Sequence, residues 1–185
     1  MIAPLEDYSA VPAARFSVLF TAAAGQGMSL VSDVLVETAQ LLGLSVSRDD
    51  DTRSSELACS VQVGCVDGRQ GCDYLLAATA ESGLRWVRRL EPVTVALLPR
   101  NDAGFETDDP RVVWIDSAAG TLAGQIQLLG ALCVRLGWPS AVCEQALREH
   151  LPRRLVDGAI EVFREGRATE QQPARRSRQL SGYTQ

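Results

Sequence analysis

The stretch RFSVLFTAAAGQGMSL, residues 15–30, runs from apolar residues through a loop with Gly25 and Gly27 toward a helix. Such a loop can bind phosphate, because glycines let the backbone approach the anion and the helix start offers N–H groups. Dinucleotide-binding loops follow G-x-G-x-x-G, whereas here Ala22 and Ala24 stand where glycine is wanted. The residues alone leave an anion site and a corner that binds nothing both open.

An acidic run follows the second predicted strand. Asp49, Asp50 and Asp51 lie about where a dinucleotide-binding fold places the carboxylate that holds a ribose hydroxyl. This position keeps a nicotinamide-binding interpretation open. We expect the run itself to open a loop.

Other residue types limit the chemistry of the chain. All 18 basic residues are arginine, which excludes a lysine base, Schiff-base chemistry and a P-loop lysine. The one histidine, His150, lies in a polar helical stretch, where a solvated residue near a helix end is expected. The cysteines lack the spacing of a metal, cluster or disulfide framework, and Cys133 is expected in the core. They are Cys59, Cys65, Cys72, Cys133 and Cys143.

Composition predicts one globular domain. The chain has 185 residues and is 46% hydrophobic, which suits a single substantial core. It has no apolar run of membrane-spanning length and no recognisable signal peptide, so we expect a cytoplasmic protein that does not bind membranes. The net charge of −5 gives no general attraction to nucleic acid, and arginines gather in residues 148–185.

The elements that must position these residues alternate between strands and helices. Apolar periodicity predicts the order β-α-β-β-β-α-β-β-α-α-α, with Gly43 and Gly166 ending the first and last helices. The predicted strands are 15–20, 44–47, 56–64, 74–80, 92–99 and 111–116. The predicted helices are 28–42, 81–90, 119–136, 140–150 and 153–165.

This order indicates an α/β fold, a three-layer α/β/α sandwich with a central mixed sheet and a Rossmann-like βαβ start. The middle strands are joined by segments too short for crossover helices, so some must pair antiparallel. We expect a lead-in over 1–14, a domain over 15–166 and a basic, disordered tail over 167–185.

Taken together, residues 15–166 resemble the gamma subunit or domain of 2-oxoacid:ferredoxin oxidoreductases, and most of all the small (beta) subunit of indolepyruvate:ferredoxin oxidoreductase. TAAAGQG is similar to the family loop G-x-G-G-Q-G and keeps Gly25, Gln26 and Gly27. The stretches YLLAATAESGLRWVRRL, QIQLLGALCVRLG and VFREG match later family elements in order.

The departures fall at polar or glycine positions. Two loop glycines are alanine, the family's R-G-G is Arg53-Ser54-Ser55, and Ala159 stands where the family has asparagine. The apolar framework persists, which suggests a divergent member with an altered ligand-binding surface.

The resemblance implies an accessory subunit with no activity alone. The complex would oxidatively decarboxylate a 2-oxoacid to an acyl-coenzyme A, with thiamine diphosphate and iron–sulfur clusters on a larger partner subunit and ferredoxin as acceptor. This chain would complete the assembly and the cleft where substrate or coenzyme A enters, and a homodimer stays open. A stand-alone nucleotide- or coenzyme A-binding protein and an assembly protein without catalytic role are the alternatives.

The resemblance also implies a ligand site for phosphate, coenzyme A or substrate, with no catalytic and no metal residues. Its residues are Gly25, Gln26, Gly27, Arg53, Ser54 and Ser55. Arg53 would pair with a phosphate or carboxylate, or alternatively form a salt bridge with residues 49–51. Gln125 is expected to satisfy buried backbone groups.

Overall fold

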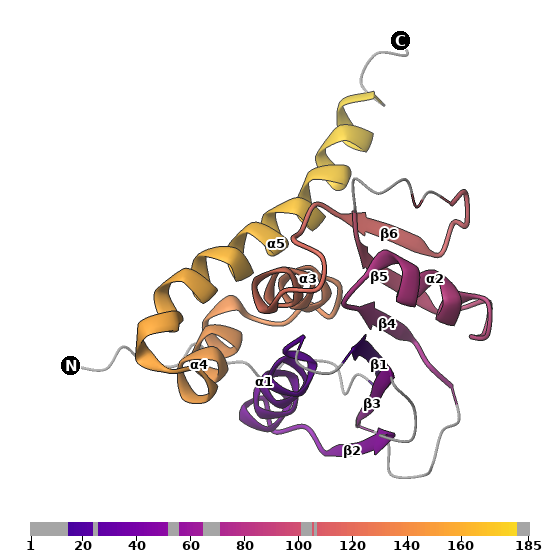
Figure 1. Cartoon of the computed structure of the whole chain (residues 1–185). Helices are drawn as coiled ribbons and strands as arrows, with labels where there is room; N and C mark the ends of the chain where they lie inside the picture. Colours follow the sequence, from indigo (N-terminus) through magenta and orange to yellow (C-terminus); the bar gives the residue numbers. More distant parts are fainter. Residues whose placement is uncertain are drawn as a thin grey trace.

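A six-stranded sheet forms the centre of the protein (Figure 1). The computed structural model describes residues 15–23, 26–51, 56–64, 71–100, 105 and 107–180. The strands are β1 (Phe16–Ala23), β2 (Val46–Asp51), β3 (Glu56–Val63), β4 (Tyr74–Ala77), β5 (Val95–Pro99) and β6 (Val112–Ile115). The helices are α1 (Met28–Leu41), α2 (Ala80–Val87), α3 (Leu122–Arg135), α4 (Ser140–His150) and α5 (Arg153–Leu180).

The strand order is β2-β3-β1-β4-β5-β6. The pairs β1–β4, β4–β5 and β5–β6 are parallel, whereas β3 pairs antiparallel with both β1 and β2. The antiparallel pairs follow from the short β2–β3 connection, which cannot hold a crossover helix. The predicted element order and the mixed sheet are both confirmed.

Helices cover the two faces of the sheet unequally (Figure 1). Alternate residues of β1, including Phe16, Val18 and Phe20, share one large apolar core with α1, α3, α4 and α5. α2 covers the other face, where Leu75 and Leu98 belong to a second, smaller core. These layers confirm the predicted three-layer α/β/α sandwich.

We expected the acidic run to open a loop, and this expectation is wrong. β2 continues through Asp49, Asp50 and Asp51, and it forms one edge of the sheet. Arg48 donates hydrogen bonds to Asp33 on α1 and to Asp50, which ties this edge strand to the helix. An edge strand tolerates consecutive acids because its outer side is open to solvent.

The last helix is longer than predicted, so the expectation that it ends at Gly166 is wrong. α5 extends to Leu180 and continues past the body of the protein (Figure 1). A Cβ on Gly166 would lie only 1.9 Å from the carbonyl oxygen of Gln127 on α3. Gly166 therefore allows two helices to pack closely, a role that the sequence does not distinguish from a helix end. Within the described residues, no helix is both long and apolar enough to cross a membrane.

Candidate functional site at the carboxyl ends of β1 and β4

The connections that leave β1 and β4 diverge. These strands are parallel neighbours, yet the chain passes from β1 to α1 on one face and from β4 to α2 on the other. In open α/β sheets, such a point leaves a crevice beyond the carboxyl ends of the strands, where ligands bind. The glycine loop singled out by the sequence lies at this point.

Gly27 sets the geometry of the loop where α1 begins. Its φ of 82° is in the left-handed region, which favours glycine. A Cβ at this position would lie 2.9 Å from Cδ1 of Leu122, at the start of α3. The backbone conformation therefore requires glycine, and a larger residue would also displace the Leu122 side chain.

Gln26 is used to hold the loop in place. Its side-chain Oε1 accepts a hydrogen bond from the N–H of Ala23 at 2.8 Å. Its Nε2 faces Gly120, where an added Cβ would come within 3.1 Å. The N–H of Gly120 in turn donates to the carbonyl oxygen of Ala78 at 2.7 Å. The turns after β1, β4 and β6 are thus packed into one unit.

The three helices that start at this edge differ in capping. The hydroxyl of Thr79 accepts from the N–H of Ser82 in α2, and the hydroxyl of Thr121 accepts from the N–H of Gly124 in α3. No side chain among the described residues caps the start of α1. Because the first N–H groups of a helix have no partner within it, α1 offers its amides and its positive dipole end to an anion.

Only part of the predicted ligand site lies in the described part of the chain. Gln26 and Gly27 stand at the carboxyl end of β1, as expected for an anion-binding turn. Gly25, Arg53, Ser54 and Ser55 lie outside the described residues. The role of Arg53, ligand contact or salt bridge, therefore stays a prediction.

The aspartates on which the nicotinamide-binding interpretation depended lie too far from the glycine loop to bind a ribose beside it. β3 lies between β2 and β1, so the aspartates are two strands away, roughly 10 Å from β1. Asp49 and Leu19 face the same residue of β3, and so do Asp51 and Thr21. The aspartates therefore lie beside the middle of β1 and do not reach its end at Ala23. The inserted antiparallel strand, which sequence periodicity does not position, is the reason for the difference.

The described residues hold no group of three or more histidine, cysteine, aspartate or glutamate side chains that could bind a metal ion. Cys133 is 1% exposed, which confirms it as a core residue, and His150 is the exposed last residue of α4, as predicted. Burial raises the pKa of the Cys59 and Cys72 thiols to about 11, so both are protonated at neutral pH. These thiols are poor nucleophiles.

Gln125 is 2% exposed, and its Nε2 has no hydrogen-bond partner among the described residues. The expected bond to a buried backbone carbonyl is therefore not made by this nitrogen, and a role for the side-chain oxygen stays a prediction. Thr79, Gly120 and Thr121, which also lie at this edge, were not predicted from the sequence. A glycine and a threonine directly before an apolar helix are a recognisable helix-start signal, which could have placed the turn after β6.

Comparisons with known proteins agree on the fold. No family model matches the sequence, and no curated protein matches it either. The gamma subunit of a keto/oxoacid ferredoxin oxidoreductase from Geobacter sulfurreducens is similar in structure, with a TM-score of 0.69 and 19% identity over 84% of this chain and 98% of that one. A pyruvate oxidoreductase subunit from Thermotoga maritima gives a TM-score of 0.65 and 18% identity over 82% and 94%.

A third similar structure is the 2-oxoglutarate:ferredoxin oxidoreductase from Magnetococcus marinus, with 2-oxoglutarate, coenzyme A and succinyl-CoA bound. The TM-score is 0.67 at 16% identity, and the match covers 85% of this chain but 31% of that one. The similar fold therefore makes up only part of that longer enzyme chain. The fold of this chain is that of the gamma subunits of oxoacid:ferredoxin oxidoreductases.

Proposed function

We propose that this chain is the accessory gamma subunit of a cytoplasmic 2-oxoacid:ferredoxin oxidoreductase. The complex converts a 2-oxoacid and coenzyme A to an acyl-coenzyme A and carbon dioxide, and two electrons pass to ferredoxin. The substrate is an aryl-pyruvate such as indolepyruvate. The chain completes the cleft for substrate or coenzyme A and has no activity alone.

The observation that carries the proposal is the uncapped start of α1 at the carboxyl ends of the parallel neighbours β1 and β4. A phosphate or carboxylate there would meet amides that no side chain caps and the positive end of a helix dipole, on a turn whose conformation Gly27 sets. Gln26 keeps this turn in place from within, through its bond to Ala23. The structural similarity to the gamma subunits supports the same role.

The redox cofactors are proposed to lie on the larger partner subunit. The described residues of this chain do not fit an iron–sulfur cluster or a metal-bound thiamine diphosphate, because they bring together no set of metal ligands. We therefore assign this chain a binding role and derive no chemical step from it. Coenzyme A contact is proposed at the α1 turn, with Arg53 as partner of an anionic group.

Purification of the native complex with a tag on this chain tests the proposal. A larger subunit with thiamine diphosphate and iron–sulfur absorbance should co-purify, and the complex should reduce ferredoxin only with a 2-oxoacid and coenzyme A present. Comparing indolepyruvate with pyruvate and 2-oxoglutarate identifies the substrate class. Binding of coenzyme A by the isolated chain without any partner would instead favour a stand-alone binding protein, and a partner without catalytic activity would favour an assembly protein.

A pair of arginine variants tests the site within this complex. Arg53→Ala should raise the KM for coenzyme A or the 2-oxoacid without lowering the melting temperature of the chain. Arg48→Ala is the control, because Arg48 already pairs with Asp33 and Asp50 and should affect stability rather than KM. A loss of stability in Arg53→Ala with unchanged KM would assign Arg53 to a structural salt bridge.

A further inference from the structure

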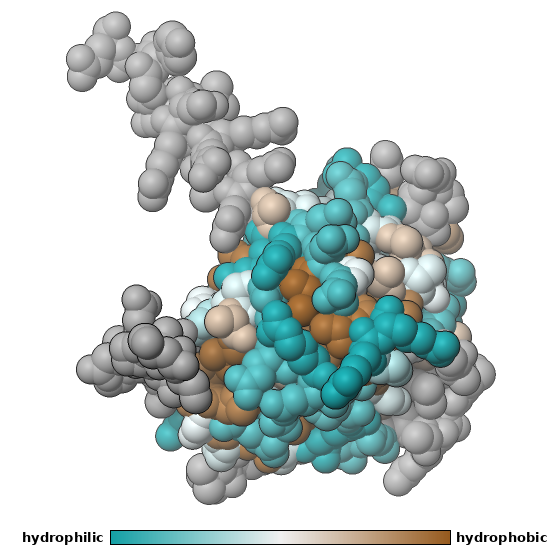
Figure 2. All heavy atoms as spheres, turned by 90° about the vertical axis from the view of Figure 1, so that its left-hand side faces the viewer, coloured by the Kyte–Doolittle hydropathy of each residue, from teal (hydrophilic) through white to brown (hydrophobic). Residues whose placement is uncertain are grey.

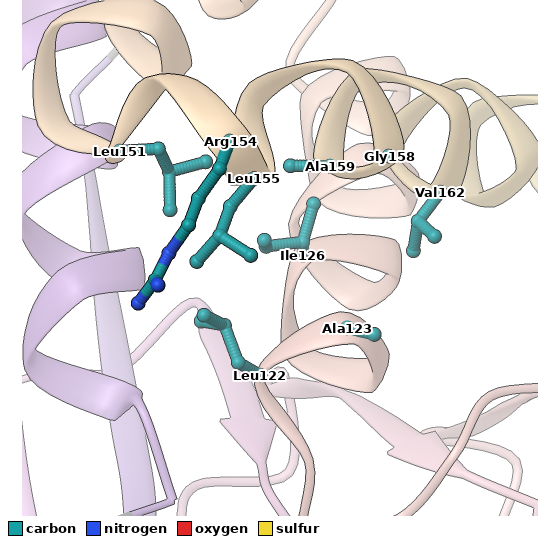
Figure 3. Close-up of a pocket in the computed structure, with 9 residues that line it drawn as sticks. All are labelled: Leu122, Ala123, Ile126, Leu151, Arg154, Leu155, Gly158, Ala159 and Val162. Atoms are coloured by element: carbon teal, nitrogen blue, oxygen red, sulfur yellow. The ribbon is translucent and has the colours of Figure 1, made fainter.

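An apolar groove lies between α3 and the first half of α5 (Figure 3). Its volume is about 420 Å³, and the side chains of Leu155 and Ile126 point toward one another across it. Arg154 also lines it, and its side chain extends away from α5 between Leu151 and Leu155. The α5 residues Leu155 and Val162 both line it and are seven residues apart, so the groove follows α5 for about 10 Å, or two helical turns.

Two features of α5 at this groove have no use within the described part of the chain. Leu155 is 43% exposed, and apolar surface opens among polar residues on this side of the molecule (Figure 2). A Cβ on Gly158 would meet nothing within 4 Å, whereas Gly130 and Gly166 are needed for close packing between α3 and α5. A glycine inside a helix costs about 1 kcal/mol relative to alanine. Nothing inside the described chain compensates for this cost at Gly158.

The first turn of α5 carries the wrong charge for its position. Arg153 and Arg154 occupy it, and no acidic residue is present there. Positive charges near a helix start oppose the helix dipole by roughly 0.3–1 kcal/mol each. Within the described part of the chain, neither guanidinium has an ion-pair partner. Local features that reduce stability without compensation are expected at functional surfaces.

We propose that the α3–α5 groove is the docking surface for an amphipathic helix of the larger partner subunit, with a carboxylate on that helix that pairs with Arg154. The identity of this partner rests on the proposed function. The partner's apolar side chains fill the groove at spacings of three and four residues, as in other helix-in-groove complexes. Gly158 lets the two helices approach closely, because no side chain separates them there.

The lining favours a helix over a small molecule. Ligand pockets combine apolar walls with several convergent polar groups, whereas this groove offers the single charged side chain of Arg154. Two turns of open, apolar surface instead suit two or three side chains of a third helix packed on α3 and α5. The unpaired guanidinium then gives the orientation of that helix, with its carboxylate at the Arg154 end.

The test compares groove variants with a matched surface variant in the tagged, full-length chain purified with its complex. Leu155→Asp and Gly158→Leu should each reduce retention of the larger subunit about tenfold or more, equivalent to about 1.4 kcal/mol of binding free energy. Val93→Asp is the control, since Val93 is 72% exposed and lies outside the groove. Gly158→Leu also guards against misfolding, because the added side chain enters open space. Melting temperatures of the isolated chains verify this.

Each outcome decides the matter. If the wild-type chain retains the thiamine- and cluster-bearing subunit and both groove variants retain it equally, the docking proposal fails and the proposed function stands. If the wild-type chain retains no such subunit, both fail. Should the groove variants instead dissociate a homo-oligomer in light scattering, or release a small molecule seen by native mass spectrometry, the groove belongs to a second copy or to a ligand, and the proposal is overturned.

Discussion

Replacing Gly27 by alanine tests how rigidly the α1 turn is held against α3. The φ of 82° costs an alanine about 1–2 kcal/mol, because its Cβ crowds the neighbouring carbonyl in the left-handed region. The same Cβ would lie 2.9 Å from Cδ1 of Leu122, and moving that side chain off its rotamer costs about 0.5–1.5 kcal/mol more. We expect Gly27→Ala to lower the free energy of unfolding by about 1.5–3.5 kcal/mol.

Gly43 provides the control for backbone strain alone. Its φ of 73° is similar, and a Cβ there would meet nothing within 4 Å. Gly43→Ala should therefore cost only about 1–2 kcal/mol. Urea unfolding of both variants at one temperature measures the difference. Combining Gly27→Ala with Leu122→Ala should recover about 1 kcal/mol relative to the sum of the single losses, because the 2.9 Å contact with Cδ1 is then removed.

Two results would refute this reasoning. One is a Gly27→Ala variant that loses no more stability than Gly43→Ala. The other is a coupling energy of zero between positions 27 and 122. Either would mean that the turn and α3 do not restrain one another, and the candidate anion site would lose the fixed geometry on which its binding depends.

Two further predictions concern α5. Gly158→Ala should raise the free energy of unfolding by about 1 kcal/mol through helix propensity, while Gly166→Ala, whose Cβ would lie 1.9 Å from a backbone carbonyl oxygen, should lower the melting temperature markedly. Bidentate hydrogen bonds from Arg164 hold the pKa of Glu144 below its usual value. The ionised carboxylate therefore stabilises the fold fully at pH values above its unfolded-state pKa, and this stabilisation is lost as the pH falls through the lower pKa of the folded state. Arg164→Ala should therefore make stability fall less steeply with decreasing pH, as measured by chemical unfolding between neutral pH and pH values below 4.5, the ordinary pKa of glutamate.

Sequence periodicity was sufficient for the order of elements, because most of them carry their own local signals. The apolar face of α1 includes Val31, Val34 and Leu35, which are all buried, and Gly43 ends that helix in the left-handed conformation. Alternation in β1 likewise separates Phe16 and Val18 from the opposite face. Each of these patterns depends on a few adjacent residues.

The differences arise where distant residues decide the outcome. Asp49–Asp51 have the composition of a loop, yet the ladder with β3 and the ion pairs of Arg48 keep them in a strand. Gly166 has the identity of a helix end, yet its neighbour is Gln127 on another helix. Local sequence propensity does not predict contacts with residues that are distant in the chain.

For the same reason, only the glycine loop of the candidate site was predicted from the sequence, and the residues that support the loop were not. The glycine loop is contiguous and contains its own signal in Gly27. Its support comes from Gly120 and Leu122, which follow nearly a hundred residues later and reach the loop only because β6 and α3 return to the same edge of the sheet. The absence of a side-chain cap on α1 likewise becomes meaningful only beside the capped starts of α2 and α3.

Leu122 connects the two proposals physically. Its side chain limits the position of Gly27 at the proposed anion site, and the same residue lines the groove proposed for the partner helix. A partner side chain in that groove would pack against Leu122 and restrict its rotamers, because close-packed side chains have little room to move. Docking would then hold the α1 turn in its binding geometry, which gives a physical reason for an accessory subunit to bind its ligand well only within the complex.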